Sequence, residues 1–266
     1  MDLSALEARH GGRIGLFAEG PVGRVQWRAG ERFAYCSTFK LFLAACVLDR
    51  VQKGQERLDR PVLVAASDMV MHGPVTEPAI GSTLTIETLC KAIVEVSDNP
   101  AANILFREMG GLETLQAWYR SIKDDVTRVD RYETALNSAD PGDLRDTTTP
   151  EQFAANLAVV MDEGLLSPDH LALLTRWLIE TPTGSGRIKA GVPAGYRVAH
   201  KTGTGAHNTH NNIAVIQTPS GGSIRMVVYY TEAQDASPEQ VDQVVAEATR
   251  QSMQALGHGG AIGAQA

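Results

Sequence analysis

The chain has 266 residues, of which 43% are hydrophobic and 21% are charged, an ordinary globular composition. Its formal net charge of −7 argues against nucleic acid as a partner, because phosphates require a clustered basic face. No apolar stretch approaches the roughly 20 residues of a membrane span, and Met1 to Ser4 show neither the basic nor the apolar region of a signal peptide.

The predicted elements are strands near the two ends of the chain and helices between them. Two short runs around Glu19-Gly20-Pro21 predict a hairpin with strands at 13–18 and 23–28. From Ser37 onward, apolar residues recur at helical spacing until Lys53. Further helices are predicted at 85–96, 100–109, 112–121, 150–163 and 168–180, then strands at 196–201, 212–218 and 223–230, and a last helix at 238–256.

This order of elements indicates a split domain of the α/β (α+β) class. We expect a five-stranded antiparallel sheet built from both ends of the chain, flanked by the terminal helices, with an inserted all-helical domain docked on its edge. The α/β domain is predicted at 1–34 and 181–256, the helical domain at 35–180, and a flexible tail at 257–266. A functional site is expected in the cleft between the two parts.

The first motif with chemical meaning is Ser37-Thr38-Phe39-Lys40, at the start of a predicted helix. Residues three apart on a helix share a face, so the Lys40 amine can reach the Ser37 hydroxyl. A nucleophilic serine needs an adjacent base or a lowered pKa, and the free N–H groups of a helix N-terminus favour a forming oxyanion. Taken alone, the motif is equally explained by a helix-capping serine beside a solvent-exposed lysine.

Two further triplets follow on other predicted elements. Ser97-Asp98-Asn99 lies on a short connection, where such residues routinely form turns and caps. Lys201-Thr202-Gly203 lies on a predicted strand, and Gly203 leaves room for a backbone or a ligand to approach. Together, on helix, loop and strand, these motifs are the signature of class A β-lactamases and penicillin-binding proteins. The chain resembles class A serine β-lactamases over nearly its whole length.

A fourth segment favours the β-lactamases over the penicillin-binding proteins. Residues 131–137 and 141–150 resemble the class A omega loop, a compact surface loop. The resemblance implies that Glu133 and Asn137 hold and polarise a deacylating water, whereas penicillin-binding proteins lack this glutamate. Arg131 and Asp146 match the family pair that ties the ends of the loop together. The alternative is a surface ion pair worth about 0–1 kcal/mol.

The resemblance implies hydrolysis of the β-lactam amide of penicillins and cephalosporins through a serine acyl-enzyme, conferring antibiotic resistance, with no metal and no cofactor. Ser37 would lose its proton to Lys40, or to Glu133 through a water. Ser97, beside Lys40 and Lys201, would relay a proton to the lactam nitrogen. The N–H groups of Ser37 and Thr204 would form the oxyanion hole. The expected substrate-binding residues are Asn99, Asn137, Thr202, Gly203, Thr204, Arg187 and His72.

Some positions depart from the family pattern. Thr134 stands where many relatives have proline, and we predict a cis Glu133–Thr134 peptide because that bond is cis in the family. His210 stands where many relatives carry a carboxylate-binding arginine, so Arg187 is predicted to bind the substrate carboxylate with its fork. The alternative for Arg187 is an exposed surface arginine. His72 lies near the aromatic gatekeeper of relatives, and a solvated loop histidine explains it equally well.

The remaining histidines suggest a metal site, but they lack a neighbouring carboxylate and a second layer of hydrogen-bonded partners. His200, His207 and His210 are therefore expected to contribute a polar cleft wall.

The sequence contains three cysteines, Cys36, Cys46 and Cys90. Where relatives carry the disulfide partners of Cys36 and Cys90, this chain has Gly205 and Ala44. Three free thiols are predicted. Carbapenem hydrolysis is an option that rests only on Cys36, Thr204 and Arg187.

Three alternatives remain: a penicillin-binding D,D-peptidase, a β-lactam sensor that stays acylated, and a serine glutaminase. Each lacks the omega-loop glutamate. The expected partners are β-lactam substrates and catalytic water, with no nucleic acid and no membrane. We expect a monomer that is periplasmic or secreted, because peptidoglycan-directed drugs act outside the cytoplasm.

Overall fold

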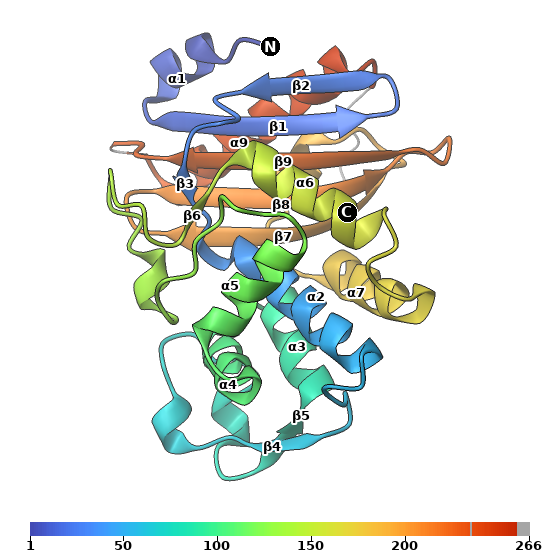
Figure 1. Cartoon of the computed structure of the whole chain (residues 1–266). Helices are drawn as coiled ribbons and strands as arrows, with labels where there is room; N and C mark the ends of the chain where they lie inside the picture. The colour runs from blue at the N-terminus through green and yellow to red at the C-terminus, as the bar shows by residue number, and fades with distance from the viewer. Residues whose placement is uncertain (235, 260–266) are drawn as a thin grey trace.

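A five-stranded antiparallel sheet joins the two ends of the chain. The structure, a computed structural model, describes residues 1–234 and 236–259 (Figure 1). The strand order is β2-β1-β9-β8-β7, and every neighbouring pair is antiparallel, as predicted. The strands are β1 (Arg13–Gly20), β2 (Gly23–Trp27), β7 (Arg197–Gly205), β8 (Thr209–Gln217) and β9 (Ser223–Thr231). This order leaves β7 at an edge of the sheet.

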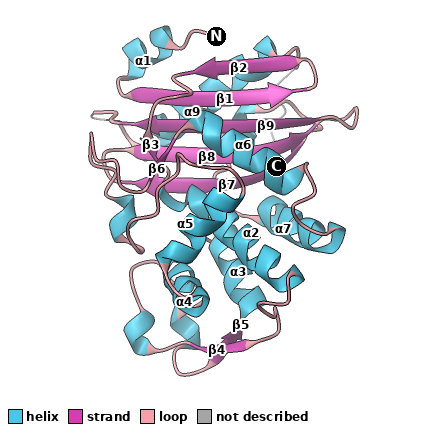
Figure 2. Ribbon diagram, in the orientation of Figure 1, coloured by secondary structure: helices cyan, strands magenta, loops and turns pink. Residues whose placement is uncertain are grey.

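The two faces of the sheet enter two separate cores. Successive side chains of a strand point to opposite faces, so Met226 and Val228 of β9 join one core while Val227 and Tyr229 join the other. Figure 2 shows helices on both sides of the magenta sheet. The core behind the sheet is completed by α1 (Ser4–His10), α8 (Ile188–Gly191) and α9 (Pro238–Ala255).

The helices from the middle of the chain share the second core with the sheet. In Figure 1, α6 lies in front of the sheet and the others lie mainly below it. The Phe153 ring of α6 lies 6.3 Å from the Tyr229 ring of β9. The predicted division into domains at residue 180 therefore stays a prediction, because this core is continuous. The helices are α2 (Phe39–Gln52), α3 (Ile86–Glu95), α4 (Asn99–Met109), α5 (Leu112–Ser121), α6 (Pro150–Met161) and α7 (Pro168–Glu180).

Two helices begin at the capping residues that the sequence indicated. Thr85 precedes α3 and accepts a hydrogen bond from the Thr88 N–H at 3.2 Å. Thr149 precedes α6 and accepts one from the Gln152 N–H at 3.2 Å. Each cap satisfies a helix N–H that would otherwise lack a partner, and typically contributes about 1 kcal/mol.

Some boundaries differ from the predictions. A 3₁₀ turn over Cys36–Thr38 precedes α2, so Ser37 lies before the α-helix rather than on its first turn. Strand β7 continues beyond residue 201 to Gly205, because its two glycines allow it to run against that turn. The pattern did not place α1 and α8, which are too short for a clear period. It also did not place the short strand pairs β3 (Phe33–Ala34) with β6 (Thr147–Thr148) and β4 (Pro61–Leu63) with β5 (Thr83–Thr85).

The C-terminal tail lies mostly outside the described residues, since 260–266 are not part of them. At its start, the His258 ring is hydrogen-bonded to the Tyr196 hydroxyl at 2.9 Å. None of the helices within 1–234 and 236–259 combines the length and the apolarity that crossing a bilayer requires.

Candidate active site

A cleft of about 820 Å³ lies between the β7 edge of the sheet and the helices. The two serines of the first two motifs, Ser37 and Ser97, both line it. All residues predicted to bind substrate line it as well, namely His72, Asn99, Asn137, Arg187, Thr202, Gly203 and Thr204. The fold therefore brings the separate motifs of the sequence to one cavity.

An ion pair between Lys40 and Glu133 lies beneath Ser37. Lys40 Nζ is 2.8 Å from Glu133 Oε1, and both side chains are 0% exposed. The Ser37 hydroxyl lies 3.4 Å from the same Oε1 atom. One carboxylate oxygen thus faces both the hydroxyl and the ammonium group.

The predicted direct contact between Lys40 and Ser37 is a correction. Among the described residues, the hydrogen-bond partners of Lys40 Nζ are Glu133, the Ser97 carbonyl at 2.8 Å, the Asn99 Oδ1 at 2.5 Å and, more weakly, the Ser97 hydroxyl at 3.4 Å. An ammonium group has three donors, and the three short contacts account for them. In this arrangement it is Glu133, rather than Lys40, that contacts the Ser37 hydroxyl.

Burial lowers the pKa of Lys40, although the neighbouring Glu133 charge opposes the shift. Burial also holds the pKa of Lys201 well below its usual value, and the positive charge of Lys40 acts in the same direction. Lowered pKa values bring both amines closer to the neutral form, which can accept a proton.

We expect the Lys40→Met variant to lose about 3–5 kcal/mol of unfolding free energy, because it leaves Glu133 buried without a counter-charge. Denaturant unfolding at pH 7 measures this loss. Lys91→Met is the matched control, because the Lys91 side chain is 51% exposed in a 3.7 Å pair with Glu95, and it is expected to cost less than about 1 kcal/mol. Equal losses in the two variants would contradict the importance of the buried pair.

The Ser97 hydroxyl lies between two lysines. Lys201 Nζ donates to Ser97 Oγ at 3.1 Å, and Lys40 Nζ lies 3.4 Å from the same oxygen. Asp98 has a structural role: its carboxylate accepts from the Ala101 N–H at 2.8 Å as the cap of α4, and from the Thr76 hydroxyl at 2.8 Å. The second motif thus aims one residue at the cleft and anchors its loop with the next.

Both ends of Glu133 are held in place. Asn137 Nδ2 donates to Glu133 Oε2 at 2.5 Å. The Asn103 side chain donates to the Glu133 carbonyl at 2.8 Å and accepts from its N–H at 2.9 Å. The Glu133–Thr134 peptide is cis, as predicted. Asn103 was missed from the sequence, although it lies one helical turn beyond Asn99 on α4 and so shares its face.

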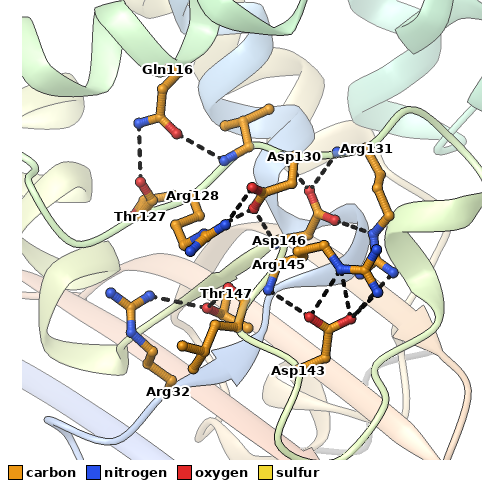
Figure 3. Close-up of polar contacts among 12 residues, drawn as sticks. Arg32, Gln116, Thr127, Arg128, Asp130, Arg131, Asp143, Arg145, Asp146 and Thr147 are labelled. Carbon is orange, nitrogen blue, oxygen red and sulfur yellow. Dashed lines mark hydrogen bonds and ion pairs between the residues drawn. The ribbon is translucent and has the colours of Figure 1, made fainter.

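The base of the omega loop is a network of charged side chains (Figure 3). Arg131 Nε lies 2.5 Å from Asp146 Oδ2, and the Asp146 side chain is fully buried. The other Asp146 oxygen accepts from the Asp130 N–H at 2.8 Å and from the Tyr35 hydroxyl at 3.2 Å. The alternative of a weak surface ion pair is therefore wrong for this pair, because Asp146 is buried and bonded on both oxygens.

Strand β7 packs directly against the turn that carries Ser37. A Cβ atom added to Gly203 would lie 2.8 Å from the Tyr35 carbonyl, 3.0 Å from the Thr38 nitrogen and 3.1 Å from the Ser37 nitrogen. Only glycine permits this approach. The contact brings the Ser37 backbone next to Thr204, the two residues predicted to form the oxyanion hole.

Gly203→Ala is therefore expected to push β7 away from Ser37 and to lower kcat/KM by about 10²-fold, the typical cost of losing one oxyanion-hole donor. Stopped-flow measurement of the acylation rate tests this. Gly30→Ala is the matched control, since a Cβ added there meets nothing within 4 Å. Acylation at the wild-type rate in Gly203→Ala would refute the role of this contact.

The structure separates the histidines. His200 is 0% exposed and hydrogen-bonded to Asn212 at 3.2 Å, so it cannot form a cleft wall as predicted. The reason is strand alternation, which turns His200 away from the face that carries Lys201. Burial lowers the pKa of His200 to about 3, which keeps it neutral at physiological pH. His207 is exposed and lies 3.2 Å from Asp140.

Other predictions can also be compared with the geometry. Arg187 is 7% exposed, so it is not a surface arginine; its Nε lies 2.7 Å from Asp242. His72 is exposed at the cleft and hydrogen-bonds the Val96 carbonyl at 2.8 Å. The prediction of three free thiols is confirmed, and all three cysteines are buried.

Comparisons with known proteins agree with this geometry. The family model described as "Beta-lactamase enzyme family" matches residues 2–256. The β-lactamase of Amycolatopsis lactamdurans is 39% identical over 258 residues, which cover 96% of this chain and 84% of that protein. A solved class A β-lactamase, the last common ancestor of Gram-negative bacteria, superposes with a TM-score of 0.92 at 47% identity, covering 95% of this chain and 97% of that one. The chain belongs to the class A β-lactamases.

This β-lactamase hydrolyses the amide bond of β-lactams through a serine acyl-enzyme, the activity that confers resistance. The family, the fold class and the enzymatic activity predicted from the motifs are thereby confirmed. A carbapenem-hydrolysing β-lactamase named KPC, from Klebsiella oxytoca, is similarly related, with 39% identity over 96% of this chain and 88% of that protein.

Proposed function

We propose that this β-lactamase opens the ring of penicillins and cephalosporins by double displacement at Ser37, with Glu133 as the base that releases the product. The observation that carries the proposal is the shared carboxylate oxygen: Glu133 Oε1 lies 3.4 Å from the Ser37 hydroxyl and 2.8 Å from Lys40 Nζ. A nucleophile within reach of a base that a third group orients is the arrangement that covalent catalysis requires.

Acylation begins when Ser37 attacks the lactam carbonyl. The contacts favour Glu133 over Lys40 as the acceptor of the Ser37 proton, since Lys40 is occupied by other oxygens. The backbone N–H groups of Ser37 and Thr204 stabilise the developing oxyanion. Ser97, supplied by Lys201 at 3.1 Å, then protonates the lactam nitrogen and so completes ring opening.

Substrate recognition uses the rim of the cleft. Thr202, Gly203, Thr204 and Arg187 form the side that faces the substrate carboxylate, and His72 forms part of the mouth. The substrate's side-chain amide is assigned to Asn99 and Asn137. Both polar atoms of Asn99 already have partners, in Lys40 and the Met71 carbonyl. Asn137 Oδ1 has none among the described residues, which makes it an available acceptor for an amide N–H or for water.

Deacylation uses the opposite wall of the site. Glu133 Oε1 removes a proton from a water as that water attacks the ester, and Asn137 holds the Glu133 carboxylate through Oε2 at 2.5 Å. The enzyme acts as a monomer on small β-lactams, in the periplasm or the medium, where peptidoglycan-directed drugs act.

Turnover of a chromogenic cephalosporin by the purified enzyme tests the proposal. Many ring openings per protein molecule are expected, since Glu133 supplies a base for deacylation. One equivalent of product followed by arrest would instead indicate a penicillin-binding protein or a β-lactam sensor, and would contradict the role given to Glu133.

A further inference from the structure

Arg187 is enclosed by acceptors behind Thr204. Its Nε donates to Asp242 Oδ1 at 2.7 Å. Its Nη1 donates to two backbone carbonyls, those of Gly203 and Asn211, both at 2.9 Å. Its Nη2 donates to Thr204 Oγ1 at 2.8 Å. A guanidinium has five N–H donors, and four of them are therefore assigned.

The fifth donor, on Nη2, faces His210 Nδ1 at 3.2 Å. The same Nδ1 atom lies 2.6 Å from Asp242 Oδ1. Although burial raises the pKa of Asp242, the hydrogen bond from His210 and the charge of Arg187 outweigh it and lower the pKa overall, so this carboxylate is ionised at neutral pH. An ionised carboxylate only accepts, so Nδ1 carries the hydrogen and cannot accept from Arg187.

One Nη2 hydrogen is then the only donor of Arg187 left for a ligand. The two parallel N–H groups of a bidentate carboxylate contact are not free. This corrects the expectation that the fork of Arg187 grips the substrate directly.

Thr204, by contrast, is exposed in the cleft, and its hydroxyl oxygen is the acceptor of Arg187. A hydroxyl has one donor and two acceptor lone pairs. With a lone pair directed at Arg187, the hydroxyl hydrogen is turned away from the guanidinium and toward the cavity.

We propose that Arg187 is a positioning residue that orients the Thr204 hydroxyl as the donor to the substrate carboxylate, and that Asp242, together with His210, holds Arg187 in this role. The inference rests on the proposed function, since it concerns the carboxylate of the same β-lactam. Thr204 makes the contact with the carboxylate. Arg187 acts through Thr204, and Asp242 reduces the positive charge that the pocket presents.

A double-mutant cycle between Arg187 and Thr204 tests the inference. Dissociation constants are measured by calorimetry in a Ser37→Ala background, where covalent chemistry is blocked, for a cephalosporin and for its carboxylate methyl ester. The readout is the preference for the acid over the ester. Arg187→Met and Thr204→Val are each expected to reduce this preference about tenfold, the effect of a hydrogen bond to a charged group. The double variant is expected to lose no more than Thr204→Val alone.

Direct binding by Arg187 predicts a different result. Its loss would multiply with that of Thr204→Val, to about a hundredfold in the double variant, and this would overturn the inference. Thr204→Ser retains the hydroxyl and is expected to retain the preference. Arg187→Lys retains the charge but not the fork, so it is expected to lose the preference as Arg187→Met does. A wild-type preference in Arg187→Lys would show that charge alone suffices and would equally overturn the inference.

Two further variants complete the experiment. Asp242→Asn keeps the oxygen that accepts from Arg187 but removes the negative charge, so it is expected to tighten acid binding about threefold. Weaker acid binding would contradict the role given to Asp242. Arg176→Ala removes an exposed charge on α7 outside the cleft lining and is expected to leave the preference unchanged. Because these constants do not depend on turnover, failure of the inference and failure of the proposed function give distinguishable results.

Discussion

Ser37→Ala is expected to lower kcat by about 10⁶-fold, the effect of removing a catalytic serine that acts as a unit with its base. No other side chain can replace the nucleophile, because the neighbouring Lys40 and Glu133 are bonded to each other beneath it. The residual rate comes from the oxyanion hole and from substrate binding. Hydrolysis of a chromogenic cephalosporin at high enzyme concentration measures this effect.

The control for this variant is Ser82→Ala, which removes the hydroxyl of an exposed serine and is expected to leave kcat unchanged. Thermal unfolding of both variants shows whether each is folded. A folded Ser37→Ala enzyme that retains more than about 1% of the wild-type kcat would be incompatible with Ser37 as the nucleophile, because the expected loss is orders of magnitude larger.

Glu133→Gln is expected to slow deacylation by about 10²–10⁴-fold, the usual contribution of a general base. The amide has the size of the carboxylate, and its oxygen can still accept from Asn137, but it cannot remove a proton from water. Pre-steady-state kinetics should show one equivalent of product released in a burst, followed by slow turnover.

Glu163→Gln is the matched control, because Glu163 is exposed and lies after the end of α6, away from the cleft. It is expected to turn over at the wild-type rate without a burst. If deacylation in Glu133→Gln matched that of the wild type, another base would have to activate the water.

Local sequence was sufficient to find the groups that react. Lys40 and Ser97 are 57 residues apart, and Lys201 and Ser97 are 104 apart, yet all three meet in the structure. They could be predicted because each lies in a short motif whose element type was visible in the periodicity. The sheet could be predicted for the same reason, since its strands have clear alternation and turn signals.

The partners of these groups could not be predicted from local sequence. Arg187 and Asp242 are 55 residues apart, and no motif contains Asp242. Their contact depends on how α9 packs behind the sheet. The position of His200 could have been predicted, because alternation places it opposite Lys201 on β7. The hydrogen bonds of Lys40 depended on the conformation of the Ser97 loop, which composition alone does not determine.

The most direct test of the account is intact-mass spectrometry of the Glu133→Gln enzyme mixed with a penicillin, followed by peptide mapping. The account predicts a persistent adduct with the mass of the whole antibiotic on the peptide that contains Ser37, and no adduct in the Ser37→Ala enzyme. An adduct on another residue, or rapid turnover of Glu133→Gln without any adduct, would contradict acylation at Ser37 and deacylation by Glu133.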